Sequence, residues 1–432
     1  MRRYLLTVTI FFICLCSIAQ ETAAVFSKFT TAQGRKNFYD NLVSNSIRKN
    51  LSMPLSATTA ENWQEAFSSM ELIGFKEDWV KKNIKTALDS IKERYSNKLN
   101  NISTTAIDIS FERSLLEMLY VLYPTDFKEE IRELMRITPS TRIFAMGAAY
   151  LENAGENPAM ILSLGLASIV TVKTMDGEPR LIDFINVLPG SRKEKKWDKK
   201  LNDLFERKFE GSTIVYSLQR KNRNYPGIAI VKDMAGNFVR NSDGTIFSVP
   251  QLARSVSNMP GYLTNGNTPQ GLYRMYGFAV SKSSFIGPTE NIQLTMPFET
   301  SVQHFLKDST VTDTVWTEKL YQSLLPKSLK DDKGLMESYF ASRFGRTEII
   351  AHGTAVDPEF YKGQPYYPLT PTAGCLATKE IWYADGNRAI SDQQKLVDAV
   401  KKAGGPDGYI IVIELDDQQK AVTLQDVLVF LN

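Results

Sequence analysis

The sequence predicts a multidomain α+β protein in which an α-helical N-terminal domain precedes a mostly β domain with inserted helices. Between residues 58 and 153 apolar residues recur at helical spacing, and beyond residue 215 short apolar runs alternate with turn dipeptides. A chain of 432 residues is also too long for one small core. We therefore expect a mainly helical domain over residues 21–190, a charged boundary over 191–214, and a second domain over 215–432.

The first twenty residues are expected to be a secretory signal peptide. Arg2 and Arg3 precede an apolar run that ends at Cys16, and small residues follow it. This run is shorter than the ~20 residues that cross a bilayer, and no later apolar run is long enough either. We therefore expect an exported protein with no transmembrane anchor once residues 1–20 have been removed.

Charge and composition argue against several classes of protein. The formal net charge of +3 falls to +1 when the two arginines of residues 1–20 are removed (3 − 2), so the chain has no electrostatic reason to bind nucleic acid. Two histidines and one remaining cysteine match no metal-ligand spacing, and we expect no metal. The glycine spacing fits neither a phosphate loop nor a dinucleotide fingerprint, and we expect no cofactor.

The N-terminal helices are predicted by apolar spacing and by signals at their ends. Thr58 and Glu61 form a candidate capping box, and Gly74 ends the helix that follows. We interpret the whole set as an irregular helical bundle, because no fixed repeat is evident. Further amphipathic helices are expected over 36–49, 79–95, 111–122, 126–137 and 140–153.

The pattern becomes strand-like before the charged boundary. Strands are predicted over 169–172 and 181–187, and the charged run over 192–200 is interpreted as a solvated linker or helix start. Beyond it, turn dipeptides separate further strands, expected over 227–232, 237–240, 246–249, 272–280, 291–296, 348–351 and 409–415. Helices are expected among these strands over 251–257, 317–325, 335–344 and 391–403.

Cys375 and His352 are the candidate nucleophile and base. Removal of residues 1–20 leaves Cys375 as a lone thiol in an oxidising compartment, which points to a chemical use. The alternative is a buried and inert cysteine, and the sequence leaves both open. A thiol of ordinary pKa is mostly protonated near neutrality and needs a base. His352 ends an apolar strand beside Gly353, whereas the other histidine, His304, lies in an amphipathic segment that suggests packing.

The glycines beside this pair have expected uses of their own. Gly374 allows a tight turn in which the backbone N–H of Cys375, with that of Gly374 or Ala373, faces a developing oxyanion. No acid in the sequence has an obvious claim to orient His352. A backbone carbonyl near Gly353 is at least as suitable as the acids that follow it.

Two motifs resemble those of a known family. His352-Gly353-Thr354, followed by the segment TAGCL that ends at Leu376, resembles the signature of the L,D-transpeptidase catalytic domain. The segment NTPQGLY from Asn267 resembles the one that precedes this signature in the family. The resemblance covers about half of the chain. It implies a β-sandwich over 215–432 whose cysteine attacks the L-to-D peptide bond of a peptidoglycan stem peptide and passes the acyl group to an amine.

The resemblance also implies roles for individual residues. Cys375 is the nucleophile, His352 is the base, and Gly374 with Cys375 forms the oxyanion site, with Gly353 in support. Thr372 stands where the family has a serine. Such enzymes need no metal and no nucleotide, and the signal peptide then implies a periplasmic location.

Two departures from the family pattern leave alternatives open. Ala377 stands where many members have an arginine, so a cation that binds substrate is either absent or supplied by Arg346 or Arg388. The interval between His352 and Cys375 is also long for the family.

The long interval holds three tyrosines, Tyr361, Tyr366 and Tyr367, which either close over a substrate as a lid or only cover the domain.

Two functions remain possible besides transfer of the acyl group to an amine. One is hydrolysis by the same pair, as an L,D-carboxypeptidase or endopeptidase, and the other is binding to the cell wall without catalysis. We expect the helical domain to position the enzyme or to bind a partner protein in the cell envelope.

Overall fold

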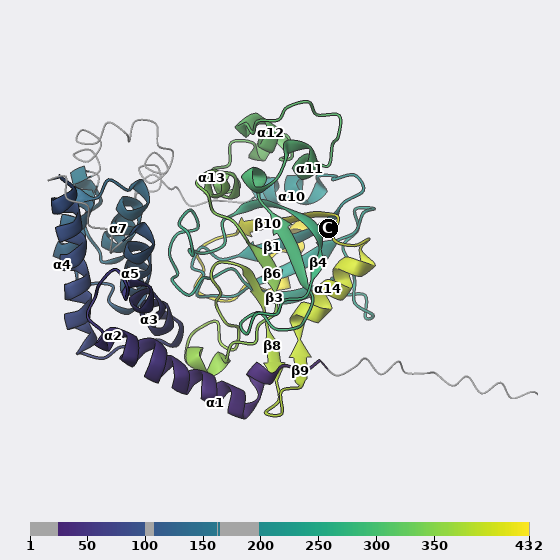
Figure 1. Cartoon of the computed structure of the whole chain (residues 1–432). Helices are drawn as coiled ribbons and strands as arrows, with labels where there is room; N and C mark the ends of the chain where they lie inside the picture. Colours follow the sequence, from purple (N-terminus) through teal and green to yellow (C-terminus); the bar gives the residue numbers. More distant parts are fainter. Residues whose placement is uncertain (1–24, 100–107, 162, 165–197, 432) are drawn as a thin grey trace, which may run out of the picture.

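The computed structural model describes residues 25–99, 108–161, 163–164 and 198–431 (Figure 1). It contains helices and strands, and the predicted α+β class is confirmed. Eight strands close into a barrel, and a separate two-stranded sheet lies beside it. The expected signal peptide, the strands predicted over 169–172 and 181–187, and most of the charged boundary lie outside the described residues.

The N-terminal helices lie close to where apolar spacing predicts them. Asp108 and Ser140 each accept a hydrogen bond from the N–H three residues on, and Gly74 ends a helix in the left-handed region at φ +66°. The predicted capping box at Thr58 is wrong, because the N-cap residue is Thr59, whose hydroxyl donates to the carbonyl of Pro54 (2.7 Å) instead. The helices are η1 (Lys28–Thr30), α1 (Ala32–Asn41), η2 (Leu42–Lys49), α2 (Asn50–Ser52), α3 (Ala60–Ile73), α4 (Val80–Leu99), α5 (Ile109–Leu122), α6 (Lys128–Ile137) and α7 (Thr141–Asn153).

One hydrophobic core holds these helices together. Helix α3 packs on α5, and α5 and α6 pack on α7. Phe67 meets Trp63 and Phe111 edge to face, with ring centroids 6.1 and 5.6 Å apart. Met259 and Leu263, from a loop of the barrel, are buried in the same core. The helices are therefore fixed to the barrel by an apolar contact. Within the described ranges, no helix combines the length and apolarity needed to cross a membrane.

The barrel closes in the order β1, β10, β4, β5, β6, β7, β3 and β2. Two neighbouring pairs are parallel, β1 with β10 and β6 with β7. The sandwich implied by the resemblance is therefore replaced by a closed barrel, because β6 pairs with β5 on one side and with β7 on the other. The barrel strands are β1 (Thr213–Gln219), β2 (Gly227–Lys232), β3 (Ser248–Leu252), β4 (Gly271–Ala279), β5 (Asn291–Thr295), β6 (Ile350–His352), β7 (Leu376–Thr378) and β10 (Gly408–Glu414), and β8 (Glu380–Trp382) pairs with β9 (Arg388–Ser391) outside it.

The two faces of the barrel sheet belong to different apolar clusters. In β1, Val215 joins the cluster inside the barrel, whereas Ile214 and Tyr216 join the cluster outside it. Helix α14 (Asp392–Lys402) contributes to the inner cluster. Four helices cover the outer face and lie together on one side of the barrel (Figure 1): α10 (Asp198–Glu206), α11 (Val302–Leu306), α12 (Glu318–Gln322) and α13 (Glu337–Arg343).

Several segments after the boundary differ from the prediction. Residues 237–240, expected to be a strand, form only isolated bridges at Phe238 and Arg240, and strands β7, β8 and β9 are not among those predicted. Residues 251–257, expected to be helical, hold the end of β3 and a loop, because Gln251 and Leu252 pair with the distant strand β7. Strand β1 is absent from the prediction because all seven of its residues are buried, which removes the alternation of a half-exposed strand.

The chain before α1 ties the N-terminal helices to the β8–β9 hairpin. Ser27 donates its N–H to the carbonyl of Gly386 (2.9 Å), and Arg388 donates its N–H to the carbonyl of Val25 (2.8 Å). Helix α1 then runs from the hairpin toward the other helices (Figure 1). The helices are thus attached to the barrel part at a second place.

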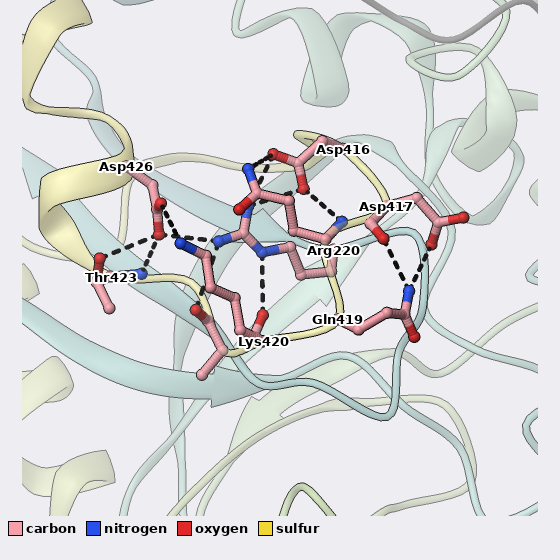
Figure 2. A network of polar contacts seen from close by, with 9 residues as sticks. Arg220, Asp416, Asp417, Gln419, Lys420, Thr423 and Asp426 are labelled. Carbon is pink, nitrogen blue, oxygen red and sulfur yellow. Dashed lines mark hydrogen bonds and ion pairs between the residues drawn. The ribbon is translucent and has the colours of Figure 1, made fainter.

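A buried arginine fastens the C-terminal segment to the barrel (Figure 2). Arg220 follows β1, is fully buried, and donates to both carboxylate oxygens of Asp416 (2.8 and 2.9 Å) and to Asp426 (2.8 Å). Its Nε donates to the carbonyl of Lys420 (3.1 Å), and the Thr423 hydroxyl donates to Asp426 (3.0 Å). A buried guanidinium is tolerated only where several acceptors replace water, and this network supplies them.

Replacing Arg220 by methionine is expected to lower the free energy of unfolding by ~3–5 kcal/mol, because two carboxylates lose the cation that compensates them. Lys221→Met is the matched control. It removes an exposed pair with Asp417 at 4.0 Å, and its cost should stay below ~1 kcal/mol. Urea denaturation followed by tryptophan fluorescence measures both changes. Equal losses in the two variants would contradict a structural role for Arg220.

Candidate active site

Cys375 and His352 face the same way on neighbouring strands. In the parallel pair of β6 and β7, His352 stands opposite Ala377. Side chains at paired positions and at alternate positions share a face, so Cys375, two residues before Ala377, lies on the face that carries His352. Strand spacing places their Cα atoms about 8 Å apart, which an imidazole and a thiol can bridge. The register therefore places Cys375 and His352 on the same face of the β6–β7 pair, two residues apart along it.

The thiol of Cys375 is protonated at rest. It is partly exposed, and its Sγ lies 3.7 Å from the carbonyl oxygen of Glu348, which accepts its S–H. The surrounding protein atoms raise the pKa of the Cys375 thiol by burial, and the N–H of Ile350 and the charge of Arg346 only partly oppose this rise. A nucleophile in this state needs a base to remove its proton.

His352 is held as a neutral base. Its side chain is buried, and Nδ1 is in hydrogen-bond contact with the carbonyl oxygen of Gly353. Because a carbonyl only accepts, Nδ1 carries the proton and Nε2 is left as the basic atom. Burial lowers the pKa of His352 to about 4, so the ring is unprotonated at neutral pH. The Gly353 carbonyl is thus the group that orients the base. It is one of the alternatives that the sequence leaves open.

The backbone at Gly353 rests on a buried carboxyl group. A Cβ at this position would collide with the carboxyl of Glu380. Glu380 accepts hydrogen bonds from the hydroxyls of Thr289 (2.5 Å) and Ser391 (2.6 Å), and burial raises its pKa. Gly353 is therefore required as glycine by the close approach of Glu380, a residue that the sequence does not single out.

The turn before β7 is fixed by hydrogen bonds on both sides. Thr372 Oγ1 accepts the N–H of Gly374 (3.0 Å) and donates to the carbonyl of Cys375 (2.9 Å). Gly374 has φ +111°, and its carbonyl accepts the Thr268 hydroxyl (2.9 Å). In a trans peptide the N–H of Cys375 points opposite to this fixed carbonyl. Because the N–H of Gly374 is already used, the Cys375 N–H is the better oxyanion donor of the two.

Arg346 holds the loop before β4 against this turn. Its guanidinium is buried, and burial lowers its pKa to about 10. A Cβ at Gly374 would collide with it, so the glycine also makes room for the arginine. The guanidinium is occupied by backbone carbonyls and positions the turn rather than facing a substrate. The carbonyls that accept from it are those of Gly261, Leu263 (3.0 Å), Gly266 (2.6 Å), Asn267 (2.9 Å) and, at 3.5 Å, Gly374.

Replacing Arg346 by lysine is expected to lower the free energy of unfolding by ~2–3 kcal/mol, because a lysine cannot reach all of these carbonyls. Arg346→Gln also removes the charge that lowers the pKa of Cys375. Alkylation by iodoacetamide as a function of pH measures that pKa, which we expect to rise in Arg346→Gln and to stay near the wild-type value in Arg346→Lys. Identical profiles for the two variants would show that the charge does not act on the thiol.

Arg388, the other arginine considered for substrate binding, lies on β9. It donates to the hydroxyl of Thr289 (2.6 Å) and lies 3.8 Å from Glu380. Its partners, Thr289 and Glu380, therefore belong to the side chains that pack behind Gly353, and the structure does not place Arg388 at the Cys375 turn.

The three tyrosines of the long interval have different environments. Tyr361 ends η5 (Pro358–Tyr361), and its ring meets that of Tyr366 at 5.9 Å. Both are buried in an apolar cluster that includes Leu252 of β3 and Ala377 of β7, so they cover these two strands. Tyr367 is 40% exposed and donates to Glu359 (2.7 Å). Of the three, Tyr367 is the one at the surface.

Glu348 is a second residue of the site that the sequence does not single out. It has φ +63°, an uncommon value for a residue with a Cβ, and its N–H donates to the carboxylate of Glu299 (2.8 Å). This conformation turns the Glu348 carbonyl toward Cys375. Its only sequence signal is its position just before the strand that carries His352.

The described part of the chain contains no group of three or more His, Cys, Asp or Glu side chains placed to hold a metal ion. His304, on α11, lies with its ring 6.4 Å from that of Tyr276, apart from this site. No protein-family model, curated protein or solved structure matches the chain. The chemistry of the site is therefore argued from its own residues.

Proposed function

We propose that the protein is an exported, cysteine-dependent acyltransferase that acts on peptidoglycan stem peptides as an L,D-transpeptidase. The observation that carries the proposal is a cysteine and a histidine on one face of the β6–β7 pair, with Nδ1 of the histidine on the Gly353 carbonyl and with a turn that fixes the direction of the Cys375 N–H. The motif resemblance supplies the substrate class. The expected signal peptide supplies the periplasmic location.

The proposed reaction begins when His352 Nε2 takes the proton from Cys375 Sγ. The sulfur attacks the carbonyl carbon of the peptide bond, and the Cys375 N–H donates to the oxyanion that forms. As the C–N bond breaks, His352 returns the proton to the leaving amine, and a thioester remains on Cys375. An acceptor amine, deprotonated by His352, then attacks the thioester and releases the thiol.

The burial of His352 fits this sequence of steps. Because its pKa is about 4, the base is ready at neutral pH, and the imidazolium that forms during attack is a strong acid toward the leaving amine. The orienting carbonyl of Gly353 keeps Nε2 as the proton-accepting atom throughout.

Incubation of the purified protein with muropeptides that carry tetrapeptide stems tests the proposal, with mass spectrometry of the products and Cys375→Ala as the control. Cross-linked dimers support transfer to an amine. Tripeptides or cleaved dimers assign the same Cys–His pair to hydrolysis, as an L,D-carboxypeptidase or endopeptidase. Unchanged muropeptides in the presence of a reactive thiol would refute peptidoglycan acyl transfer and leave binding to the cell wall.

The N-terminal helices are proposed to hold this enzyme in the cell envelope. Their core includes Met259 and Leu263 from the loop that Arg346 binds to the catalytic turn. The same loop therefore contacts both the N-terminal helices and the turn. An envelope protein that binds these helices would be attached close to the thiol.

A further inference from the structure

The peptide unit that orients His352 is held by strand β8. Its carbonyl, from Gly353, accepts the Nδ1–H of His352, and its N–H belongs to Thr354. Two residues of β8 contact this backbone: a Cβ on Gly353 would collide with the carboxyl of Glu380, and Trp382 Nε1 donates to the Thr354 carbonyl (2.9 Å). Alternate residues of a strand share a face, so one face of β8 fixes the backbone that carries the orienting carbonyl.

One oxygen of Glu380 is occupied by two hydroxyl donors. Oε1 accepts the hydroxyls of Thr289 (2.5 Å) and Ser391 (2.6 Å). The Thr289 oxygen itself accepts from Arg388 (2.6 Å), and the Ser391 oxygen accepts the N–H of Gln394 (2.9 Å), so each hydroxyl keeps its hydrogen for Oε1. Oε1 is therefore an acceptor, and Oε2 is the oxygen that lies against the orienting peptide unit.

Glu380 presents negative charge to this peptide unit. The residue is 2% exposed, and the guanidinium of Arg388 lies 3.8 Å from Oε1. Burial raises the pKa of the carboxyl, while the two hydroxyls, the charge of Arg388 and the N–H of Thr354 oppose the rise. The Thr354 N–H thus faces the carboxyl, as expected in a trans peptide whose carbonyl points away to His352. No group within the described residues donates to Oε2 with the geometry of a full hydrogen bond, so the contact is mainly electrostatic.

A carboxylate beside the N–H end of a peptide strengthens the carbonyl at the other end as an acceptor. Hydrogen-bonded groups in a row polarise one another, and the effect is larger in a buried site of low dielectric. The Gly353 carbonyl then holds the proton of His352 on Nδ1 more firmly, which keeps Nε2 free as the basic atom. It also stabilises the imidazolium that forms when His352 takes a proton, which is the task of the acid in a Ser–His–Asp triad.

We propose that Glu380 is a positioning residue for His352 and acts through the peptide unit between Gly353 and Thr354. The carboxylate takes the part of the third group, for which the sequence offers no obvious acid. It acts on the imidazole through a backbone amide rather than by direct contact. The orientation of the ring is independent of any substrate, whereas its benefit for acyl transfer rests on the proposed function.

Glu380→Gln removes the charge without shortening the side chain. The two hydroxyls hold the amide oxygen in the place of Oε1, so the NH2 group faces the N–H of Thr354. Two donors then meet where a donor met an acceptor, and the Gly353 carbonyl should lose its hold on Nδ1. In a histidine free in water the proton prefers Nε2. We therefore expect the wild type to hold the proton on Nδ1 and Glu380→Gln to show a substantial fraction of the Nε2–H form.

Nitrogen NMR of protein labelled with ¹⁵N-histidine measures the tautomer directly, since protonated and bare ring nitrogens differ widely in chemical shift. The chain has two histidines, and His304→Ala identifies the signals of His352. Glu112→Gln is the matched control, because Glu112 is a fully buried carboxyl among the N-terminal helices that accepts the Tyr95 hydroxyl (2.7 Å). This control should leave the tautomer of His352 as it is in the wild type.

Acylation of Cys375 by p-nitrophenyl acetate at pH 7 gives a second readout without peptidoglycan, with Cys375→Ala as the blank. Glu380→Gln should slow this reaction ~5-fold, the contribution of one ordinary hydrogen bond, and Glu112→Gln should leave its rate unchanged. Thr289→Val removes one donor to Oε1 and keeps the shape of the side chain. It should shift both readouts in the same direction by a smaller amount, and it replaces Glu380→Gln if that variant does not fold.

An Nε2–H tautomer in the wild type, or the same tautomer ratio in the wild type and in Glu380→Gln, would overturn the proposal. An equal shift in Glu112→Gln would also overturn it, because the change would then follow from a general loss of stability. A tautomer shift in Glu380→Gln without slower acylation would keep Glu380 as the positioning residue and refute His352 as the base, so the two proposals fail separately.

Discussion

Cys375→Ala is expected to abolish acyl-enzyme formation completely while the protein stays folded. Cys375 is partly exposed, and its thiol contacts only backbone groups, the carbonyl of Glu348 at 3.7 Å and the N–H of Ile350, so little side-chain packing is lost with the sulfur. A substitution of this kind usually changes the free energy of unfolding by less than ~1 kcal/mol. Without sulfur no covalent intermediate forms, because no other cysteine is present in residues 21–432.

Mass spectrometry after incubation with a carbapenem measures this result, since a β-lactam that acylates the thiol adds its whole mass to the protein. The wild type should gain one adduct, and Cys375→Ala should gain none at the same melting temperature. His304→Ala is the control and should be labelled as the wild type is. If Cys375→Ala unfolds, Cys375 is a packing residue, and the alternative of a buried and chemically inert cysteine is correct.

The candidate pair is visible in the sequence because it occurs in a local pattern. A rare histidine and a lone cysteine each stand beside a glycine that the structure needs: Gly353 admits Glu380, and Gly374 adopts φ +111° beside Arg346. The groups that support the pair are not visible in this way. Glu380 contacts Gly353 only through tertiary packing, and no local sequence pattern around Glu380 predicts that contact.

The helices and most strands after the boundary follow from local spacing, whereas the closure of the barrel does not. Closure depends on β6 and β7, strands of three residues each, which pair with each other and with distant partners. Strands that short carry too few residues to show a period of two.

His352→Ala is expected to slow acylation of Cys375 at pH 7 by roughly 10²–10³-fold, the usual contribution of a general base. The alanine variant must rely on thiolate formed by the solvent. Its rate should therefore rise about tenfold per pH unit until the thiol is ionised, and it should approach the wild-type rate under alkaline conditions. Because burial raises the pKa of Cys375, this recovery lies above the ordinary range for a cysteine.

The wild type should behave differently on the acid side. The folded-state pKa of His352, about 4, lies below its ordinary value of 6.5. The ring therefore stays a base as the pH falls through 6.5, and acylation should decline only as the pH approaches 4.

The lowered pKa of His352 also means that the free energy of unfolding falls as the pH drops from 6.5 to 4, because the unfolded chain takes up a proton that the folded site excludes. Stopped-flow measurement of carbapenem consumption between pH 4 and 10, with melting temperatures at each pH, separates the two effects. An acid limb near pH 6.5 in the wild type, or a flat profile in His352→Ala, would show that His352 does not accept the thiol proton from a buried, neutral state.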